Sequence, residues 1–281
     1  MNVIIGLDPI IQEFTMKKII LAALMAVSVL AFAGCKKSNK KADGDAVAAL
    51  KARGTFVLGL DDSFPPLGFR SDDNEIVGYD IDLARYIAKA LLGDMSAVEF
   101  VPVTAENRVE KLNSHKVDIL IATMSVTNQR HLVVDFSDPY YIAGQALMVR
   151  DIKHIYSLRH LNGRRVIIVY GSTGEDSIKR NVPEATVLGF KNYPTAFDAI
   201  VRGQGYALIA DDIVLINYQG QSDKVKLLPY RYSREPYAIA FRRGEASKRL
   251  QNRVNYTLTN LKNMGVFRDM ERKWGIERKI K

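Results

Sequence analysis

The sequence is almost without cysteine, because only Cys35 among its 281 residues carries a thiol. A single thiol cannot form an internal disulfide, and it cannot build a zinc site from cysteines. The histidines lack the close spacing that a metal site needs; they are His115, His131, His154 and His160. We therefore expect neither a disulfide framework nor a bound metal.

The sequence also lacks clusters of positive charge, although its formal net charge is +9. Lysines and arginines are scattered, with no basic stripe and no alternation of basic and aromatic residues of the kind that binds nucleic acid. We expect no nucleic-acid partner. A basic protein that lies close to anionic lipid outside the cytoplasm fits this charge better.

No apolar run is long enough to cross a membrane comfortably. Residues 19–33 are apolar but short, and they follow the charged Met16-Lys17-Lys18, which is the layout of a signal peptide. We expect residues 1–34 to form a cleaved signal segment, with translation starting at Met16.

The residues on either side of Cys35 indicate a role for the single thiol. Small residues precede it (Ala33-Gly34) and the polar run 36–41 follows, so a buried structural cysteine is disfavoured. The stretch resembles the lipobox of bacterial lipoproteins, although Phe32 stands where that motif more often has Leu. The resemblance implies a lipid-modified Cys35, a membrane anchor and a flexible tether over residues 35–45.

The remaining residues show strand and helix patterns in alternation, which predicts an α/β protein. The apolar runs predicted to be strands are residues 55–60, 98–103, 117–122, 145–149, 166–169, 207–210 and 237–241. Helical spacing follows many of them, and we expect Asp80 and Thr104 to cap two of the helices. The pattern restarts at Arg150, so we expect two halves with the chain crossing between them twice.

One stretch carries a candidate binding site, because the strand 117–122 opens into alternating hydroxyls. Thr123, Ser125 and Thr127 are expected on one side of an extended chain, and Arg130 follows Thr127, a good helix N-cap. A guanidinium group, hydroxyls and free N–H groups together suit a carboxylate ligand. The alternative is that the hydroxyls only cap a helix while Arg130 pairs with a surface aspartate.

Five segments occur in the order and spacing of one known family. They are Asp61-Asp-Ser-Phe-Pro-Pro66, Gly78-Tyr-Asp-Ile-Asp-Leu83, Asp118-Ile-Leu-Ile-Ala-Thr123, Asp135-Phe-Ser-Asp-Pro-Tyr-Tyr141 and Gly171-Ser-Thr-Gly174. From about Leu50 to about Ile276 the chain resembles the polar-amino-acid-binding proteins of bacterial ABC importers. The resemblance implies a two-lobed periplasmic-binding-protein-like α/β fold of type II, with two αβα lobes joined by two hinge strands. Lobe 1 is expected over residues 46–145 and 238–281, and lobe 2 over residues 146–237.

The resemblance also implies how the ends of an amino acid are held. Arg130 is expected to bind the α-carboxylate together with Thr123 and Ser125, and Asp211 to bind the α-ammonium. Thr173 and Gly174, at the start of a helix, would add donors for the carboxylate. The alternative for Asp211 is N-capping of the next helix, a role that Asp212 could take instead.

Three further residues are expected to meet the ligand side chain. Phe64 resembles the aromatic residue that lies against it, and Asp61 occupies a position that helps to set the side-chain preference. Arg108 matches an arginine of relatives that bind acidic amino acids, whereas Asp61 argues against an acidic ligand. The two residues could neutralise each other, or they could together receive a side chain with both donors and acceptors. A neutral polar ligand such as glutamine, or cystine or cysteine, would satisfy the second arrangement.

The predicted function is capture of a polar L-amino acid by hinge closure and its delivery to an ABC permease. We expect a monomeric, lipid-anchored protein of the periplasm or cell envelope that needs no cofactor and is not an enzyme. Two alternatives remain: an enzyme on the same fold, such as a cyclohexadienyl dehydratase or a transglycosylase, and a sensor or adhesin lipoprotein.

Overall fold

A computed structural model of the chain describes residues 45–150 and 154–277. The expected signal segment 1–34, the lipidation of Cys35 and the tether up to residue 44 lie outside the described residues. Within the described ranges, no helix combines the length and hydropathy needed to cross a bilayer.

The first of two five-stranded sheets contains mainly strands from the first half of the chain, in the order β5-β1-β6-β15-β7. Its strands are β1 (Phe56–Leu60), β5 (Val98–Pro102), β6 (Ile119–Leu120), β7 (Val134–Phe136) and β15 (Ala240–Arg242). β1 pairs in parallel with β5 and β6, whereas β15 runs antiparallel to β6 and β7. The expected strand 117–122 is thus central but short.

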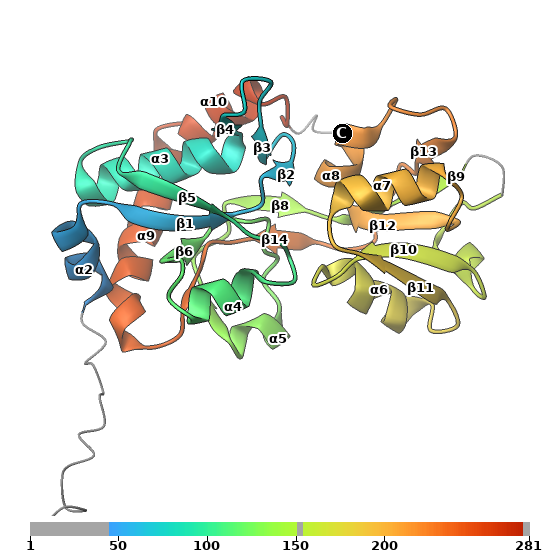
Figure 1. The fold of residues 1–281 in the computed structure, drawn as a ribbon, viewed down its shortest axis with the longest axis horizontal. Helices are drawn as coiled ribbons and strands as arrows, with labels where there is room; N and C mark the ends of the chain where they lie inside the picture. Colours follow the sequence, from blue (N-terminus) through green and yellow to red (C-terminus); the bar gives the residue numbers. More distant parts are fainter. Residues whose placement is uncertain (1–44, 151–153, 278–281) are drawn as a thin grey trace, which may run out of the picture. The chain divides into compact units, whose positions relative to one another are not determined.

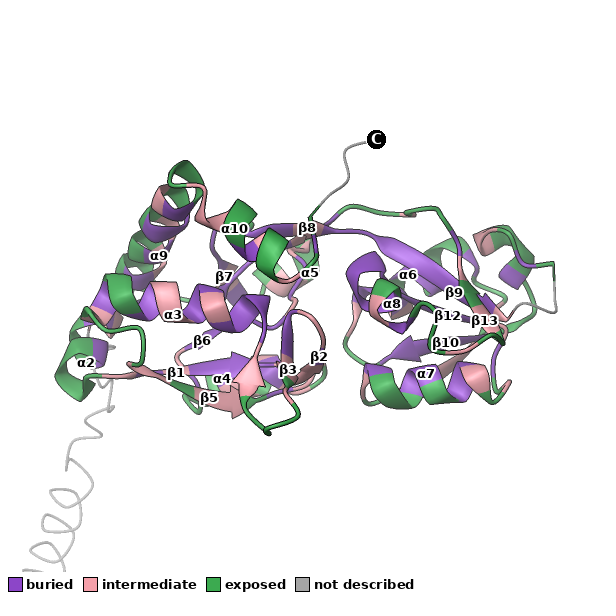
Figure 2. Ribbon diagram, turned by 90° about the horizontal axis from the view of Figure 1, so that it is seen from above, coloured by how far each residue is buried: buried purple, intermediate pink, exposed green. Residues whose placement is uncertain are grey.

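Helices cover both faces of this sheet (Figure 1). They are α2 (Ala46–Arg53), α3 (Tyr79–Leu92), α4 (Arg108–Asn113), α9 (Glu245–Asn263) and α10 (Val266–Lys273). Phe56 and Leu58 of β1 pack in one core cluster with residues of α3 and α9, while Leu120 of β6 packs with Leu112 of α4 in another. Figure 2 shows the buried side of α3, which faces this core, and its exposed side.

The second sheet has the order β11-β10-β12-β9-β13. Its strands are β9 (Gln145–Arg150), β10 (Arg165–Val169), β11 (Thr186–Phe190), β12 (Ala207–Asp211) and β13 (Val225–Leu227). Its helices are η1 (Leu158–Leu161), α6 (Thr173–Asn181), α7 (Tyr193–Val201) and α8 (Asp212–Tyr218). β9 pairs with β12 from Gln145 onward, so this sheet begins one residue before the expected bound of lobe 2.

Two short strands connect the two sheets. β8 (Tyr141–Ala143) leads into β9, and β14 (Glu235–Tyr237) returns toward β15, the two being paired antiparallel (Figure 1). The expected strand 237–241 is therefore split between β14 and β15. These paired connections are the two hinge strands of the predicted fold.

The loop after β1 forms a small sheet of its own, with strands β2 (Ser63–Phe64), β3 (Gly68–Arg70) and β4 (Ile76–Val77). α3 begins directly after it, with Gly78 as its N-cap at a φ of 138°. A Cβ on Gly78 would lie 2.2 Å from the Leu67 carbonyl oxygen, so only glycine fits there.

Two expected helix caps differ from the structure. Asp80 does not cap α3; its carboxylate is buried and accepts a hydrogen bond from the Tyr140 hydroxyl at 3.3 Å. Burial raises the pKa of Asp80 to about 8. Asn107 is the N-cap residue of α4 but makes no side-chain cap bond. Thr104 caps the turn that leads into the helix, since its hydroxyl accepts from the Asn107 N–H at 3.3 Å and its carbonyl oxygen from the Arg108 N–H at 3.0 Å.

The first helix, α2, is fixed at its start. The Asp45 carboxylate accepts from the Val47 N–H and pairs with Arg249 of α9. The first described residue of the chain is thereby attached to the first lobe, which also contains α9 and α10.

Candidate functional site

Arg130 lies where the two lobes meet. It is part of the short helix α5 (Asn128–His131), and the Thr127 hydroxyl accepts a hydrogen bond from its backbone N–H at 3.2 Å, as an N-cap does. Its guanidinium group donates to the Ser125 carbonyl oxygen at 2.8 Å and, across the lobes, to the Gly171 carbonyl oxygen at 2.9 Å. Burial lowers the pKa of Arg130, although Asp211 and Glu235 oppose this effect.

Asp211 ends β12, and its side chain is only 6% exposed. One carboxylate oxygen accepts from the Gln145 side-chain amide and the other from the Tyr237 hydroxyl. Burial raises its pKa to about 7, against the lowering effects of the Tyr237 hydrogen bond and of Arg130. The side chain makes no capping hydrogen bond to α8, which removes the alternative expected from the sequence.

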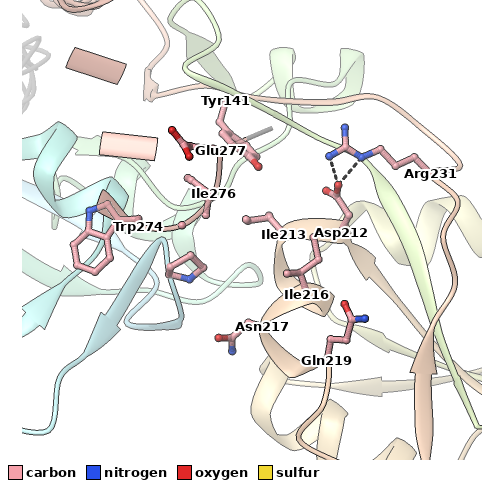
Figure 3. Close-up of a pocket in the computed structure, with 12 residues that line it drawn as sticks. Tyr141, Asp212, Ile213, Ile216, Asn217, Gln219, Arg231, Trp274, Ile276 and Glu277 are labelled. Atoms are coloured by element: carbon pink, nitrogen blue, oxygen red, sulfur yellow. Dashed lines mark hydrogen bonds and ion pairs between the residues drawn. The ribbon is translucent and has the colours of Figure 1, made fainter. Parts of the chain in front are cut away.

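Asp212 does not cap α8 either. It accepts from the Gly144 N–H at 3.1 Å and forms an ion pair with Arg231. Figure 3 shows this pair at the edge of a cavity of about 790 Å³, which is also lined by Ile213, Trp274 and Ile276. The two neighbouring acids therefore lie in different surroundings, because only Asp211 accepts from Gln145 at the start of β9 and from Tyr237 of β14.

Arg108, the first residue of α4, is buried with 3% of its surface exposed. It donates to the Ala122 carbonyl oxygen at 2.5 Å and to the Gly171 carbonyl oxygen at 3.5 Å. Burial and the nearby charge of Arg130 lower its pKa to about 9. Two guanidinium groups thus converge on the Gly171 carbonyl oxygen, an arrangement that would stabilise negative charge brought to the same place.

Asp61 and Phe64 come from the loop after β1. The Asp61 carboxylate accepts from the Ser63 N–H at 3.0 Å and hydroxyl at 2.7 Å, and burial raises its pKa while Arg108 lowers it. The buried Phe64 ring packs edge-on against Tyr193 of the second lobe, with centroids 5.3 Å apart. Asp61 therefore lies within electrostatic reach of Arg108, and Phe64 lies against Tyr193 of the opposite lobe.

The predicted hydroxyl row does not form as expected. Thr123 has a φ of 51°, so the chain is not extended there and the alternation of side chains stops. Its backbone N–H is close enough to the buried Asp80 to lower the pKa of that carboxyl group, against the larger raising effect of burial. Ser125 is buried, and the group that it offers to Arg130 is its carbonyl oxygen.

Thr173 and Gly174 begin α6 in the second lobe. The Thr173 hydroxyl accepts from the Gln145 amide at 3.0 Å, and this same amide donates to Asp211. A Cβ on Gly174 would lie 3.3 Å from the Gln145 side-chain oxygen, so the helix start is packed closely on Gln145. Contacts thus connect these two residues to Asp211.

Three residues that the sequence interpretation missed complete the site. Tyr193 interacts electrostatically with Asp211, Arg108, Asp61 and Arg130, which places its hydroxyl among all four charges. Gln145 and Tyr237 hold the Asp211 carboxylate. The Asn192 cap and Pro194 do signal a helix start at Tyr193, but no sequence signal gives the direction of its ring.

Contacts or charge interactions connect eight of the nine predicted ligand-binding residues with one another or with Gln145 and Tyr193. The ninth, Thr123, is related only to Asp80, through its backbone. Across residues 45–150 and 154–277, no group of three histidine, cysteine or acidic residues is arranged to hold a metal ion. The chemistry that these residues offer is recognition of charged and polar groups.

Comparison with known proteins shows which family has this arrangement. Residues 56–277 match the model of the bacterial extracellular solute-binding proteins, family 3. The chain belongs to this family. Its fold is the two-lobed α/β fold of periplasmic amino-acid-binding proteins, as predicted. Membership of an extracellular family indicates a location outside the cytoplasm, in the periplasm or cell envelope.

Individual relatives bind amino acids. The chain is 37% identical over 268 residues, 92% of its length, to the ABC transporter glutamine-binding protein GlnH of Bacillus subtilis, of which 97% is covered. An ancestral arginine-binding protein bound to glutamine has a TM-score of 0.74 and 38% identity, with 80% of this chain and 99% of that chain covered. An ancestral amino-acid-binding protein described as a precursor of cyclohexadienyl dehydratase has a TM-score of 0.74 and 32% identity, with 81% and 98% covered.

Proposed function

We propose that this family member captures a polar L-amino acid, with L-glutamine as the first candidate, and delivers it to an ABC permease. The observation that carries the proposal is that a buried acid of the second lobe lies within electrostatic reach of Arg130, on the first lobe. Arg130 reaches the second lobe through Gly171, and the buried Asp211 of that lobe interacts electrostatically with Arg130. The backbone end of an amino acid carries the two complementary charges.

In this proposal the α-carboxylate takes the place of carbonyl oxygens on Arg130. A bidentate carboxylate is a stronger partner for a guanidinium group than neutral carbonyls are. The α-ammonium binds Asp211, with Thr173 and Gly174 nearby on the same lobe. Because the ligand contacts both lobes only when they are closed, it shifts the population toward the closed state.

The ligand side chain is proposed to meet Asp61 and Arg108. A carboxamide has an oxygen that accepts from Arg108 and an N–H₂ group that donates to Asp61, so one glutamine side chain satisfies both. Phe64 and Tyr193 would pack on its methylene groups. The name of the Bacillus subtilis relative supports glutamine. Cystine, with a carboxylate and an ammonium group at its far end, is the alternative.

Processing, lipid attachment and oligomeric state are part of the same proposal. We infer that residues 1–34 are removed, that Cys35 is lipid-modified, and that the protein works as a monomer on a membrane of the cell envelope. Acyl chains on Cys35 would hold the binding unit close to the permease. A role as a sensor or adhesin would use the same cleft with a different partner.

A second candidate function is catalysis of the cyclohexadienyl dehydratase type. The structural neighbour described as a precursor of that enzyme favours it, and so does a buried acid whose pKa is about 7, as a general acid requires. We propose binding without turnover, because Asp211 has both oxygens engaged by donors and Arg130 complements a whole amino acid. Incubation with prephenate and arogenate, followed by product analysis, tests this candidate.

The deciding experiment is a thermal-shift screen of ligand-free protein against the twenty amino acids, cystine and ornithine, followed by calorimetry. We expect glutamine to give the largest stabilisation. Arg130→Ala should lose about 2–5 kcal/mol of binding free energy, as truncation of a buried charge pair does. Arg243→Ala is the matched control, because Arg243 also donates to a carbonyl oxygen, that of Leu132, but lies outside the site. Unchanged binding by the Arg130 variant contradicts the assignment.

A further inference from the structure

Two segments at the connection between the lobes donate to a single carboxylate. β8 and β14 are paired, with Tyr141 opposite Tyr237 and Ala143 opposite Glu235. Gln145 comes two residues after β8, and Tyr237 is the last residue of β14. The Gln145 amide donates to one oxygen of Asp211, and the Tyr237 hydroxyl donates to the other. Each passage of the chain between the lobes thus provides one donor to Asp211.

Tyr237 connects Asp211 with the opposite lobe. Its backbone bridges to Ser125, and this contact is flanked by hydrogen bonds from Ala238 N to Met124 O at 3.1 Å and from Val126 N to Pro236 O at 2.8 Å. Ser125 is the residue whose carbonyl oxygen accepts from Arg130. Tyr237, which donates to Asp211, is therefore held by the segment around Ser125, which accepts a hydrogen bond from Arg130.

Gln145 fixes the other side of the carboxylate. It lies opposite Asp211 in the β9–β12 pairing, and its amide donates to Asp211 and, at 3.0 Å, to the Thr173 hydroxyl. The residue is 1% exposed, so its amide is shielded from water and makes these hydrogen bonds inside the protein. Asp211, Thr173 and the start of β9 consequently form one hydrogen-bonded group.

We propose that Gln145 and Tyr237 are positioning residues that hold the Asp211 carboxylate in its ionised, ammonium-binding form and connect it to the hinge strand β14 and to the start of β9, directly after the hinge strand β8. This inference rests on the proposed function, since it assumes that Asp211 receives the ligand's ammonium group. It adds two residues that act through Asp211 and not through the ligand.

The charges around Asp211 explain why such donors are needed. Burial favours the neutral acid, and the acidic groups of Glu235 on β14 and Asp212 on α8 add to this effect. Arg130 on α5 and the Tyr237 hydrogen bond oppose it, and Tyr193 on α7 interacts with the same carboxylate. Donated hydrogen bonds stabilise the ionised form without adding charge, so their loss should make the acid harder to ionise.

The test compares Tyr237→Phe with the natural protein. In ligand-free protein, the ¹³C signal of the Asp211 carboxyl group, assigned with Asp211→Asn, is titrated from pH 5 to pH 9. We expect the midpoint to rise by about one pH unit or more, as the loss of a hydrogen bond to a charged group implies. Because the ionised fraction of Asp211 at pH 7 falls from about one half to about one eleventh for a rise of one unit, the Kd for L-glutamine should rise about fivefold or more at pH 7 and recover toward the natural value at pH 9.

Tyr140→Phe is the matched control, because it also removes a buried hydroxyl from the aromatic cluster at the hinge. The Tyr140 ring lies 6.5 Å from that of Tyr237, but its hydroxyl donates to Asp80. We expect the Asp211 midpoint to be unchanged in this variant. A shift in both variants, a shift in neither, or an equal loss of glutamine affinity at every pH would overturn the inference.

The two hypotheses fail in different ways. If the natural protein binds no amino acid at any pH, the proposed function fails, while the ligand-free titration still decides whether Tyr237 controls Asp211. If Tyr237→Phe does not fold, Gln145→Met is titrated instead; it removes the other donor and should raise the midpoint as well. An unshifted midpoint in that variant contradicts the inference.

Discussion

Replacement of Asp211 by asparagine should change the free energy of unfolding and the affinity for the ligand in opposite directions, so the two effects can be measured separately. The substitution keeps the shape of the side chain but removes its charge. At pH 8 we expect the Kd for glutamine to rise roughly 30- to 5,000-fold, because truncation of a buried charge contact costs about 2–5 kcal/mol. The pH dependence of binding should disappear in the variant, since the group that titrates is gone.

The stability of the ligand-free protein should change in the opposite direction. The pKa of Asp211 is raised from 3.8 to about 7, so its contribution to stability is complete below pH 3.8 and is lost as the pH rises through 7. Ionising the buried acid above pH 7 costs up to about 4 kcal/mol. Asp211→Asn removes this cost, so its advantage in free energy of unfolding should grow between pH 5 and pH 8.

Calorimetric binding and urea unfolding at pH 5 and pH 8 measure both effects. Asp212→Asn is the control, because the neighbouring acid pairs with Arg231 and the Gly144 N–H and should change glutamine affinity by only a few-fold. An Asp211→Asn variant that binds glutamine as tightly as the natural protein would refute the ammonium contact. Lower stability of that variant at pH 8 would refute the electrostatic cost.

Further expectations concern the anchor, the ligand side chain and the fold. Cys35→Ser should move the protein from the membrane to the soluble fraction in cell fractionation; unchanged fractionation argues against lipidation. Arg108→Met should weaken glutamine binding about 10- to 150-fold, through loss of a charged hydrogen bond, in calorimetry. An equal affinity would remove Arg108 from the side-chain site. Gly78→Ala should lower the free energy of unfolding by more than about 1 kcal/mol, because it adds a clash at positive φ; an unchanged urea midpoint would contradict this.

Local sequence signals anticipated the parts of the molecule that depend on neighbouring residues. Thr127 caps the turn that carries Arg130, and Asp211 ends a buried strand, as the patterns indicated. Apolar runs located most strands of both sheets, although β6 has only two residues, shorter than the expected strand 117–122. The restart of the strand and helix pattern at Arg150 predicted two halves, and the family resemblance supplied their arrangement as two lobes joined by hinge strands.

The remaining features depend on residues far apart in sequence. Thr123 adopts positive φ where its backbone meets Asp80, some forty residues earlier, so an extended hydroxyl row could not be excluded locally. Gln145 and Tyr237 reach Asp211 only because two connecting strands and β12 meet at one point. Tyr193 needs the contact with Phe64 of the other lobe. Such convergence is set by tertiary structure and leaves no periodic signal.

The ion pair between Asp45 and Arg249 joins α2 to α9 within the first lobe, so a label placed on α9 reports the position of that lobe as a whole. The sequence has no cysteine after position 35, so a thiol-reactive dye pair can be directed to two chosen sites. Exposed Tyr256 on α9 and exposed Tyr230 beyond β13, each changed to cysteine, place one fluorophore on either side of the hinge. Energy transfer between them would convert the uptake of an amino acid into an optical signal.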